Sequence, residues 1–252
     1  MRHPSIQVHP DTESLARVAA EQFVALAQEA ITRRGRFSVA LAGGSTPRRT
    51  YERLSDEPFA SQVDWTRVHV FWGDERCVPP DHPESNYRMA RETLLDRLTI
   101  PASNLHRIPC EQAPEQAAAA YEATLRAFFA EGKTPSEGAP IPRFDLILLG
   151  MGEDGHTASL FPGTAALHEE ERWVVATYVE KLGAWRVTLT PVVLNAAAYV
   201  TFLVAGKHKA QRLREVLMGP YQPDRLPAQI VRPHRGHLTW LLSVEAARLV
   251  QV

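Results

Sequence analysis

The sequence predicts an α/β fold built around one doubly wound, mainly parallel sheet with helices on both faces. Short apolar runs alternate along the chain with longer segments of helical periodicity, as in parallel strands joined by helices. These runs are continuously apolar, which is expected of strands buried on both faces. The length of 252 residues and the hydrophobic content of 44% fit a single domain over residues 1–252 with a substantial core.

The first third of the chain sets the alternation. Apolar residues recur at helical spacing from Leu15 to Ile31, with Asp11 or Thr12 as a start signal and Arg33-Arg34-Gly35 as a stop. The run Phe37–Ala42 then predicts a buried strand. A glycine turn follows it and leads into a helix opened by Pro47.

The same order repeats to the end of the chain. Strands are predicted at Val68–Trp72, Phe144–Leu149, Arg186–Thr190, Tyr199–Ala205 and around Leu238–Leu242, and helices near Glu84–Leu98, near Pro114–Ala130, at Lys207–Met218 and at the C-terminus. The segment Glu131–Arg143 is rich in Gly and Pro and predicts a surface loop, because the alternation resumes unchanged after it.

Composition narrows the function classes. The formal net charge of −1 gives no electrostatic reason to expect a nucleic acid or a membrane as partner. Cys77 and Cys110 are too few for a disulfide framework, and neither an apolar leader nor a run of membrane-spanning length is present. We therefore expect a cytoplasmic protein.

Ligands of open α/β sheets bind beyond the carboxyl ends of the strands, and the first such loop here is Gly43-Gly44-Ser45-Thr46-Pro47. Its glycines permit close approach of the backbone, and its hydroxyls and the helix start offer donors to a phosphate. The alternative is a plain turn in which Ser45 or Thr46 caps the helix and no ligand is bound.

The second loop carries Asp74, Glu75 and Arg76 directly after a strand. Three ionisable groups beside a strand end are costly to hold together unless something uses them. The alternative is an ion pair at the surface, worth little to stability. Cys77 has no identifiable activating partner and is expected to be a small, partly buried thiol.

The third loop, Gly150–Gly163, follows the clearest strand and carries the strongest signal. Three glycines within six residues indicate an unusual backbone path. Asp154 and His156 are two residues apart, so the carboxylate can approach the imidazole, fix its tautomer and raise its basicity. The pair suits a general base working near neutral pH, although a structural histidine beside an Asp-Gly turn is the alternative.

A fourth group consists of Arg186, which begins a strand, and Lys207, which lies where a strand passes into a helix. The two cations would complete a phosphate site if they converged on Gly43–Thr46, whereas alone they would be ordinary surface residues. No His or Cys pair has the spacing of metal ligands, so no metal and no cofactor is expected.

Together, Leu41–Pro47, Trp72–Arg76 and Gly150–Gly163 resemble the 6-phosphogluconolactonase family, which belongs to a superfamily that includes glucosamine-6-phosphate deaminase. The matches run in the same order from about Gly43 to Lys209, and the third motif is the specific one. The resemblance implies a modified Rossmann-like fold. It also implies a metal-free carboxylic ester hydrolase that opens 6-phospho-D-glucono-1,5-lactone in the second step of the oxidative pentose phosphate pathway.

The resemblance also implies roles for single residues. His156 would be the general base that activates water, and Asp154 would orient it. Substrate would be bound by the phosphate loop, two residues at the sugar end and two further cations: Gly43, Gly44, Ser45 and Thr46; Asp74 and Arg76; Arg186 and Lys207. The only partner expected is the small-molecule substrate, and the chain would be a monomer or a weak homo-oligomer.

Two other functions stay open. A deaminase of amino sugar phosphates would carry a further acidic residue after the Asp-Gly-His run, and Thr157–Pro162 contains no carboxylate. A non-catalytic sugar-phosphate-binding domain would keep Arg186 and Lys207 but would not need Asp154 and His156.

Overall fold

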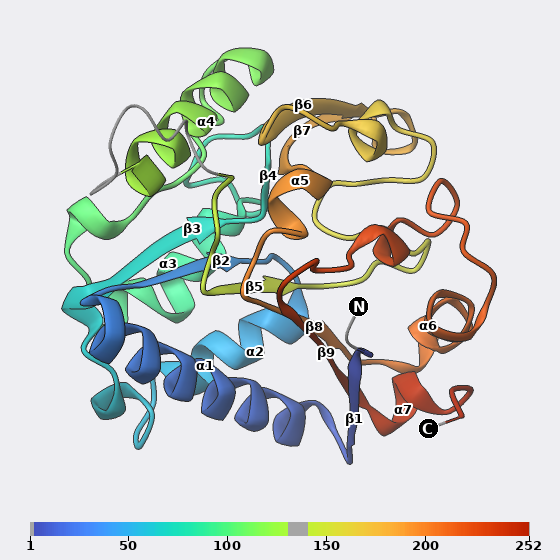
Figure 1. Cartoon of the computed structure of the whole chain (residues 1–252), viewed down its shortest axis with the longest axis horizontal. Coiled ribbons are helices and arrows are strands. Elements are labelled where there is room, and N and C mark those ends of the chain that lie inside the picture. Colours follow the sequence, from blue (N-terminus) through green and yellow to red (C-terminus); the bar gives the residue numbers. More distant parts are fainter. Residues whose placement is uncertain (1–2, 131–140, 252) are drawn as a thin grey trace.

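The computed structural model describes residues 3–130 and 141–251, so the predicted loop at Glu131–Arg143 lies mostly outside the described residues. Its main sheet has six strands in the order β1-β9-β8-β5-β2-β3, and every neighbouring pair is parallel. The strands are β1 (Ser5–His9), β2 (Phe37–Leu41), β3 (Val68–Trp72), β5 (Leu146–Leu149), β8 (Tyr199–Val204) and β9 (His237–Ser243). The parallel α/β prediction is confirmed (Figure 1).

A second, smaller sheet was not predicted. It is antiparallel, with the order β4-β7-β6, and consists of β4 (Asp74–Arg76), β6 (Val174–Val179) and β7 (Ala184–Leu189). The predicted strand at Arg186–Thr190 therefore exists but lies outside the main sheet, and Asp74–Arg76 is a strand rather than a loop. Figure 1 shows β6 and β7 at the top of the view, well apart from β1 and β9.

Helices cover both sheets. They are α1 (Thr12–Arg34), α2 (Ser45–Leu54), α3 (Asn86–Thr93), α4 (Pro114–Ala130), α5 (Pro191–Leu194), α6 (Ala210–Met218) and α7 (Val244–Ala247). In Figure 1, α1 runs along the bottom beneath the main sheet, whereas α4 lies at the upper left and packs on β6 and β7. The predicted start and stop of α1 are confirmed. Asp11 accepts a hydrogen bond from the Ser14 N–H at 2.7 Å, and Gly35 ends the helix at φ 73°.

Two buried tyrosines fix the ends of the strands that lead to the site. The Tyr51 hydroxyl accepts the N–H of Ala42 and donates to its carbonyl, at 2.9 and 2.8 Å. The Tyr121 hydroxyl does the same at Trp72, with both bonds at 2.9 Å. Burial raises the pKa of both phenols, so they stay protonated and donate at any physiological pH. The chain thus leaves β2 and β3 in a fixed direction.

The order of the strands also marks where a ligand belongs. The chain passes from β2 outward to β3, and from β5 in the opposite direction to β8, while β2 and β5 are neighbours. Such a reversal leaves a crevice at the carboxyl ends of the two strands. The first and last strands, β1 and β9, pair with each other, so the two ends of the described chain join the same sheet. The single domain over residues 1–252 stays a prediction. Among the described residues, no helix has the length and apolarity needed to cross a membrane.

Candidate active site

A cavity of about 190 Å³ lies beyond the carboxyl ends of β2, β5 and β8. It is lined by the loops that follow these strands, by the start of α2, by two residues of β4 and by one residue each of α3 and β8. These residues are Ala42, Gly43, Gly44, Ser45, Thr46, Pro47, Asp74, Arg76, Asn86, Gly150, Met151, Gly152, His156, Ala158, Leu203 and Lys209. The structure therefore brings three of the predicted loops to one place.

The predicted phosphate loop forms one wall of this cavity. The helix α2 begins at Ser45, two residues earlier than predicted, and its N-cap is Gly44 with φ 104° and no side-chain cap. The hydroxyls of Ser45 and Thr46 therefore do not cap the helix, and the alternative of a side-chain-capped turn is wrong. The first residues of α2 line the cavity, and the positive end of a helix with its free N–H groups suits an anion.

Gly43 is needed for close packing against α3. A Cβ atom there would lie 2.0 Å from the Asn86 amide oxygen, so no larger residue fits without displacing that side chain. The Asn86 amide in turn donates to the Asp74 carbonyl at 3.0 Å. The glycine thus allows the phosphate loop to lie directly against a side chain that also holds Asp74.

The histidine of the third loop meets its predicted partner. Nδ1 of His156 lies 2.5 Å from Oδ1 of Asp154, and the second carboxylate oxygen forms an ion pair with Lys181. A carboxylate at Nδ1 keeps the proton on that nitrogen and leaves Nε2 as the basic atom. Gly152 makes room for the ring, because a Cβ atom there would come within 2.1 Å of it.

The environment of His156 lowers its basicity, contrary to the prediction. Burial lowers the pKa of the imidazole to about 4, while Asp74 raises it and Lys209, Arg76 and nearby Arg186 lower it further. Removal from water disfavours the charged ring more than the acidic neighbours favour it. The ring is therefore neutral at neutral pH, which is the form a general base needs.

The loop beyond His156 is strained and tightly held. Ala158, which lines the cavity, has φ 47°, a left-handed conformation that L-residues other than glycine rarely adopt. Next to it, the Ser159 hydroxyl donates to Asp74 at 2.6 Å, and its N–H donates to the Thr188 hydroxyl at 3.2 Å. The third loop is thus tied to both β4 and β7.

Asp74 is buried to 7% exposure and faces the cavity from β4. Besides Ser159, it accepts a hydrogen bond from the Asn86 amide at 3.4 Å. The prediction for this residue did not include either partner. Asn86 and Ser159 are distant from Asp74 in the sequence. The one local signal is Ser85, a serine N-cap that marks the start of α3 next to Asn86.

Glu75 serves the fold rather than the cavity. It is buried, and its carboxylate accepts the N–H groups of Arg76, Asn86 and Tyr87 at 2.7 to 2.8 Å and the Ser85 hydroxyl at 3.1 Å. Burial raises its pKa despite these donors. The alternative, a surface ion pair among Asp74, Glu75 and Arg76, is not found within the described residues, because the Glu75 carboxylate bonds to the start of α3.

Two predicted cations lie side by side on the small sheet. Arg76 of β4 is the register partner of Arg186 in β7. Arg76 lines the cavity and donates to the Glu84 carbonyl at 2.7 Å. Arg186 is not among the residues that line the cavity, and burial and Arg76 lower its pKa. Its charge adds a small lowering to the pKa of His156, which burial lowers most.

The structure brings Lys209 to the cavity in place of Lys207. Lys207–Lys209 forms a turn of 3-10 helix before α6, and Lys207 is exposed and does not line the cavity. Lys209 lines it and is partly buried, which lowers the pKa of its ammonium group. Two residues that are two positions apart in a turn with three residues per revolution face different sides. The predicted turn therefore reaches the cavity, but through Lys209 and not through the predicted Lys207.

Among the described residues, no group of three His, Cys, Asp or Glu side chains is arranged to hold a metal ion. Metal independence stays a prediction. Cys77 does not line the cavity, and its sulfur lies 4.0 Å from that of Cys110.

Comparison with known proteins decides the family. The family model described as glucosamine-6-phosphate isomerases/6-phosphogluconolactonase matches residues 10–240. The chain belongs to this family. A 6-phosphogluconolactonase from Nostoc is 41% identical over 249 residues, which cover 98% of this chain and 99% of the relative. One from Synechocystis is 45% identical over 219 residues and 86% of each chain.

Solved structures of family members confirm the fold. A 6-phosphogluconolactonase from Trypanosoma cruzi superposes with a TM-score of 0.86 at 31% identity, covering 99% of this chain and 98% of its own. A structure described as devB protein gives a TM-score of 0.88 at 33% identity and covers 99% and 100%. A monomeric glucosamine-6-phosphate deaminase, at 22% identity and a TM-score of 0.78, shares the fold alone. The family resemblance seen in the sequence is confirmed.

Proposed function

We propose that the chain hydrolyses 6-phospho-D-glucono-1,5-lactone to 6-phospho-D-gluconate, the second step of the oxidative pentose phosphate pathway. The relatives cited above that are more than 30% identical and carry a functional name are called 6-phosphogluconolactonases. The observation that carries the proposal is the neutral His156, held by Asp154 in the cavity that also contains the Gly43–Thr46 loop and Lys209. A base and an anion site within one cavity suit a phosphorylated ester.

In the proposed reaction, Nε2 of His156 takes a proton from a water molecule as the water oxygen attacks the lactone carbonyl carbon. The Nδ1–H group stays hydrogen-bonded to Asp154, whose charge stabilises the imidazolium that forms. Collapse of the tetrahedral intermediate breaks the bond between the carbonyl carbon and the ring oxygen. That oxygen receives the proton from Nε2 and becomes a hydroxyl group, and the new carboxylic acid ionises.

The negative charge of the intermediate needs a donor in the cavity. We propose Arg76 for this role, because it lines the cavity and carries a charge at every relevant pH. Asp74 is fixed by Ser159 and Asn86, and we propose that its carboxylate accepts hydrogen bonds from the sugar hydroxyl groups. An activated ester requires no covalent nucleophile beyond water.

The phosphate end is proposed to lie on Gly43, Gly44, Ser45 and Thr46, at the start of α2. We propose that Lys209 supplies the cation there, in the role first predicted for Lys207. Direct binding of the phosphate by Arg186 was predicted, but Arg186 is not among the residues that line the cavity. We propose instead that its charge attracts the phosphate from β7.

The two other functions are less well supported. Thr157–Pro162 contains no carboxylate that could pair with His156 for the proton transfers of a deaminase. A domain that only binds sugar phosphates would not need a partly buried histidine held by Asp154, which in turn pairs with Lys181. Cytoplasmic location and a monomeric or weakly oligomeric state stay predictions; the printed names of the rice relatives include "chloroplastic".

The proposal is tested by following lactone opening with purified protein in EDTA. We expect hydrolysis well above the spontaneous rate and unchanged by the chelator, because His156 and water suffice for an activated ester. A rate equal to the spontaneous one, with or without added divalent metal, would contradict the proposed function. A rate that appears only on adding metal would contradict the metal-free mechanism.

The protonation of His156 gives a further expected result. Because the folded-state pKa is depressed to about 4, the ring should stay neutral from alkaline pH down to about pH 5 and gain its proton only below that. An NMR titration of its ring protons, assigned by their loss in His156→Gln, should have a midpoint near pH 4. A midpoint at or above 6.5 would show that Asp154 outweighs burial.

A further inference from the structure

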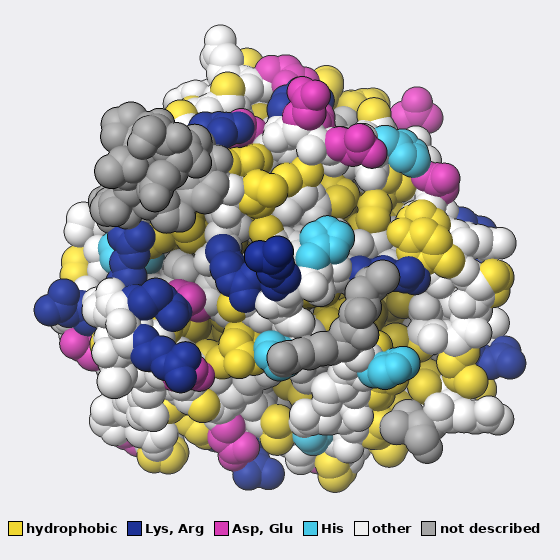
Figure 2. Space-filling model, viewed as in Figure 1, with side chains coloured by type: hydrophobic (Ala, Val, Ile, Leu, Met, Phe, Trp, Pro, Cys, Tyr) yellow, Lys and Arg dark blue, Asp and Glu magenta, His cyan; other side chains and the backbone are white. Residues whose placement is uncertain are grey.

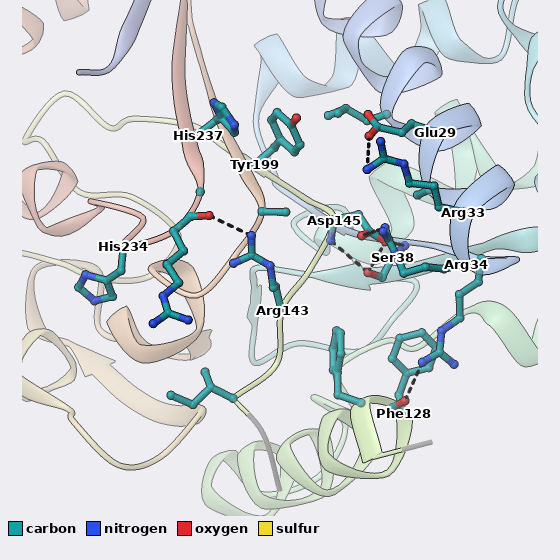
Figure 3. A pocket seen from close by; sticks show the side chains of 18 residues that line it. Glu29, Arg33, Arg34, Ser38, Phe128, Arg143, Asp145, Tyr199, His234 and His237 are labelled. Carbon is teal, nitrogen blue, oxygen red and sulfur yellow. Dashed lines mark hydrogen bonds and ion pairs between the residues drawn. The ribbon is translucent and has the colours of Figure 1, made fainter. Parts of the chain in front are cut away.

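A second and larger cavity lies at the opposite edge of the main sheet. It has a volume of about 800 Å³ and is lined by the last turns of α1, the end of α4 and the amino ends of β2, β5, β8 and β9 (Figure 3). The proposed active site uses the carboxyl ends of these strands, so the two cavities share no residue.

The lining of this cavity is strongly basic. It contains two carboxylates and five arginines: Glu29 and Asp145; Arg33, Arg34, Arg36, Arg143 and Arg235. His234 and His237 add two rings that become cationic when protonated. Positive charge is therefore concentrated in this cavity, although the net charge of the chain is −1. Figure 2 shows Lys and Arg side chains gathered at the left of the same view, where Figure 1 places the end of α1 and the start of β2.

Two of the five arginines pair with the two carboxylates of the lining within the described residues. Arg33 pairs with Glu29 at 3.0 Å, and Arg34 pairs with Asp145. Arg143 instead donates to two neutral carbonyl groups, those of Ala196 at 3.1 Å and Arg235 at 2.9 Å.

Within the described parts of the chain, neither the Arg143 nor the Arg235 guanidinium forms an ion pair with a carboxylate. In Figure 3, Arg143 lies between Asp145 and His234, in the middle of the cavity wall. Its two carbonyl bonds hold the guanidinium in place without cancelling its charge. An arginine fixed in this way, in a cavity that Arg235 also lines, can bind phosphate groups by paired hydrogen bonds.

Aromatic rings form another part of the wall. Tyr199 and His237 stack with ring centroids 4.8 Å apart and an angle of 11° between planes, and both line the cavity. Phe128 lies across the cavity, with the Arg36 guanidinium 4.2 Å above its ring. The volume lies in the range of small-molecule sites, which combine such surfaces with a few charged groups.

We propose that this cavity binds a small metabolite carrying a diphosphate or triphosphate group, with the phosphates on Arg143 and Arg235. Two free guanidinium charges match the closely spaced negative charges of such a chain better than the charge of one monophosphate. The concave shape favours a small ligand over an extended nucleic acid. The site is distinct from the proposed active site and does not depend on the proposed lactonase activity.

The test is equilibrium dialysis of the whole protein with ATP and, separately, with inorganic triphosphate. We expect saturable binding of ATP that weakens roughly tenfold or more in Arg235→Gln, because a charge-assisted hydrogen bond is lost, and that weakens as salt rises. Arg143→Gln should weaken binding further. Arg232→Gln is the matched control, since Arg232 lies three residues from Arg235 but does not line the cavity. Unchanged lactone turnover in the Arg235 variant would show that the protein is folded.

Equal affinity for triphosphate and ATP would support the proposed site and show that the cavity recognises only the phosphate chain. Higher affinity for ATP would show that the cavity also recognises the nucleoside. Three results would overturn the proposal. The first is that neither ATP nor triphosphate binds saturably at millimolar concentration. The second is that Lys209→Met abolishes binding while Arg235→Gln does not. The third is that an oligonucleotide binds more tightly than ATP.

Discussion

Replacement of His156 by alanine is expected to lower kcat for lactone hydrolysis by about a hundredfold to ten-thousandfold, the typical worth of a general base. The cavity keeps its phosphate loop and Lys209, so binding of 6-phosphogluconate should change by less than about threefold. Rates measured above the spontaneous reaction, together with calorimetric binding of the product, check both parts. The ring packs on Phe161 with centroids 4.1 Å apart, so a melting curve must accompany the assay.

The matched control is His208→Ala, which removes an exposed histidine of the neighbouring turn that does not line the cavity. We expect its turnover to equal that of the unchanged protein. Full turnover in the His156 variant would show that another group is the base. Loss of both binding and turnover in a folded variant would mean that His156 holds the ligand rather than activates water.

Replacement of Lys209 by methionine is expected to raise KM for the lactone by about tenfold to a hundredfold, as the loss of one charged hydrogen bond to phosphate predicts. Because Lys209 is one of the cations that lower the pKa of His156, the NMR midpoint of that ring should also rise. The two readouts are independent, since the first depends on the substrate and the second is measured in the free protein.

Lys207→Met tests which of the two lysines in this turn, Lys207 or Lys209, binds the phosphate. Lys207 is exposed and outside the cavity lining, so we expect its KM and the His156 titration to stay unchanged. If Lys207→Met raised KM while Lys209→Met did not, the original prediction for Lys207 would hold and the role proposed for Lys209 would be wrong.

Much of the fold was predictable because the main strands are short apolar runs with strong helix signals between them. Val68–Trp72 and Pro114–Ala130 have the predicted bounds. β1 escaped prediction because its residues are mostly exposed at the sheet edge, so it has no apolar run. β6 pairs with the next strand of the chain, β7, and was also missed. β4 pairs with β7 across more than a hundred positions. Local patterns do not record such pairing.

The predictable part of the site was the part carried by one loop. Asp154 and His156 meet because two residues of a tight turn cannot lie far apart, and glycine content revealed the turn. Asn86 and Ser159 hold Asp74 through contacts that depend on the tertiary fold, and no spacing announces them. The lowered pKa of His156 also depends on the tertiary fold, because the sequence reveals the neighbouring carboxylate but not the burial of the ring.

The most direct test of the proposed active site is a crystal structure with 6-phosphogluconate bound. We expect the phosphate on the N–H groups of Gly44–Thr46 and the ammonium group of Lys209, and the carboxylate carbon within reach of Nε2 of His156. A phosphate seated among Arg143 and Arg235 at the other edge of the sheet, with the cavity around His156 unoccupied by ligand, would contradict the proposed active site.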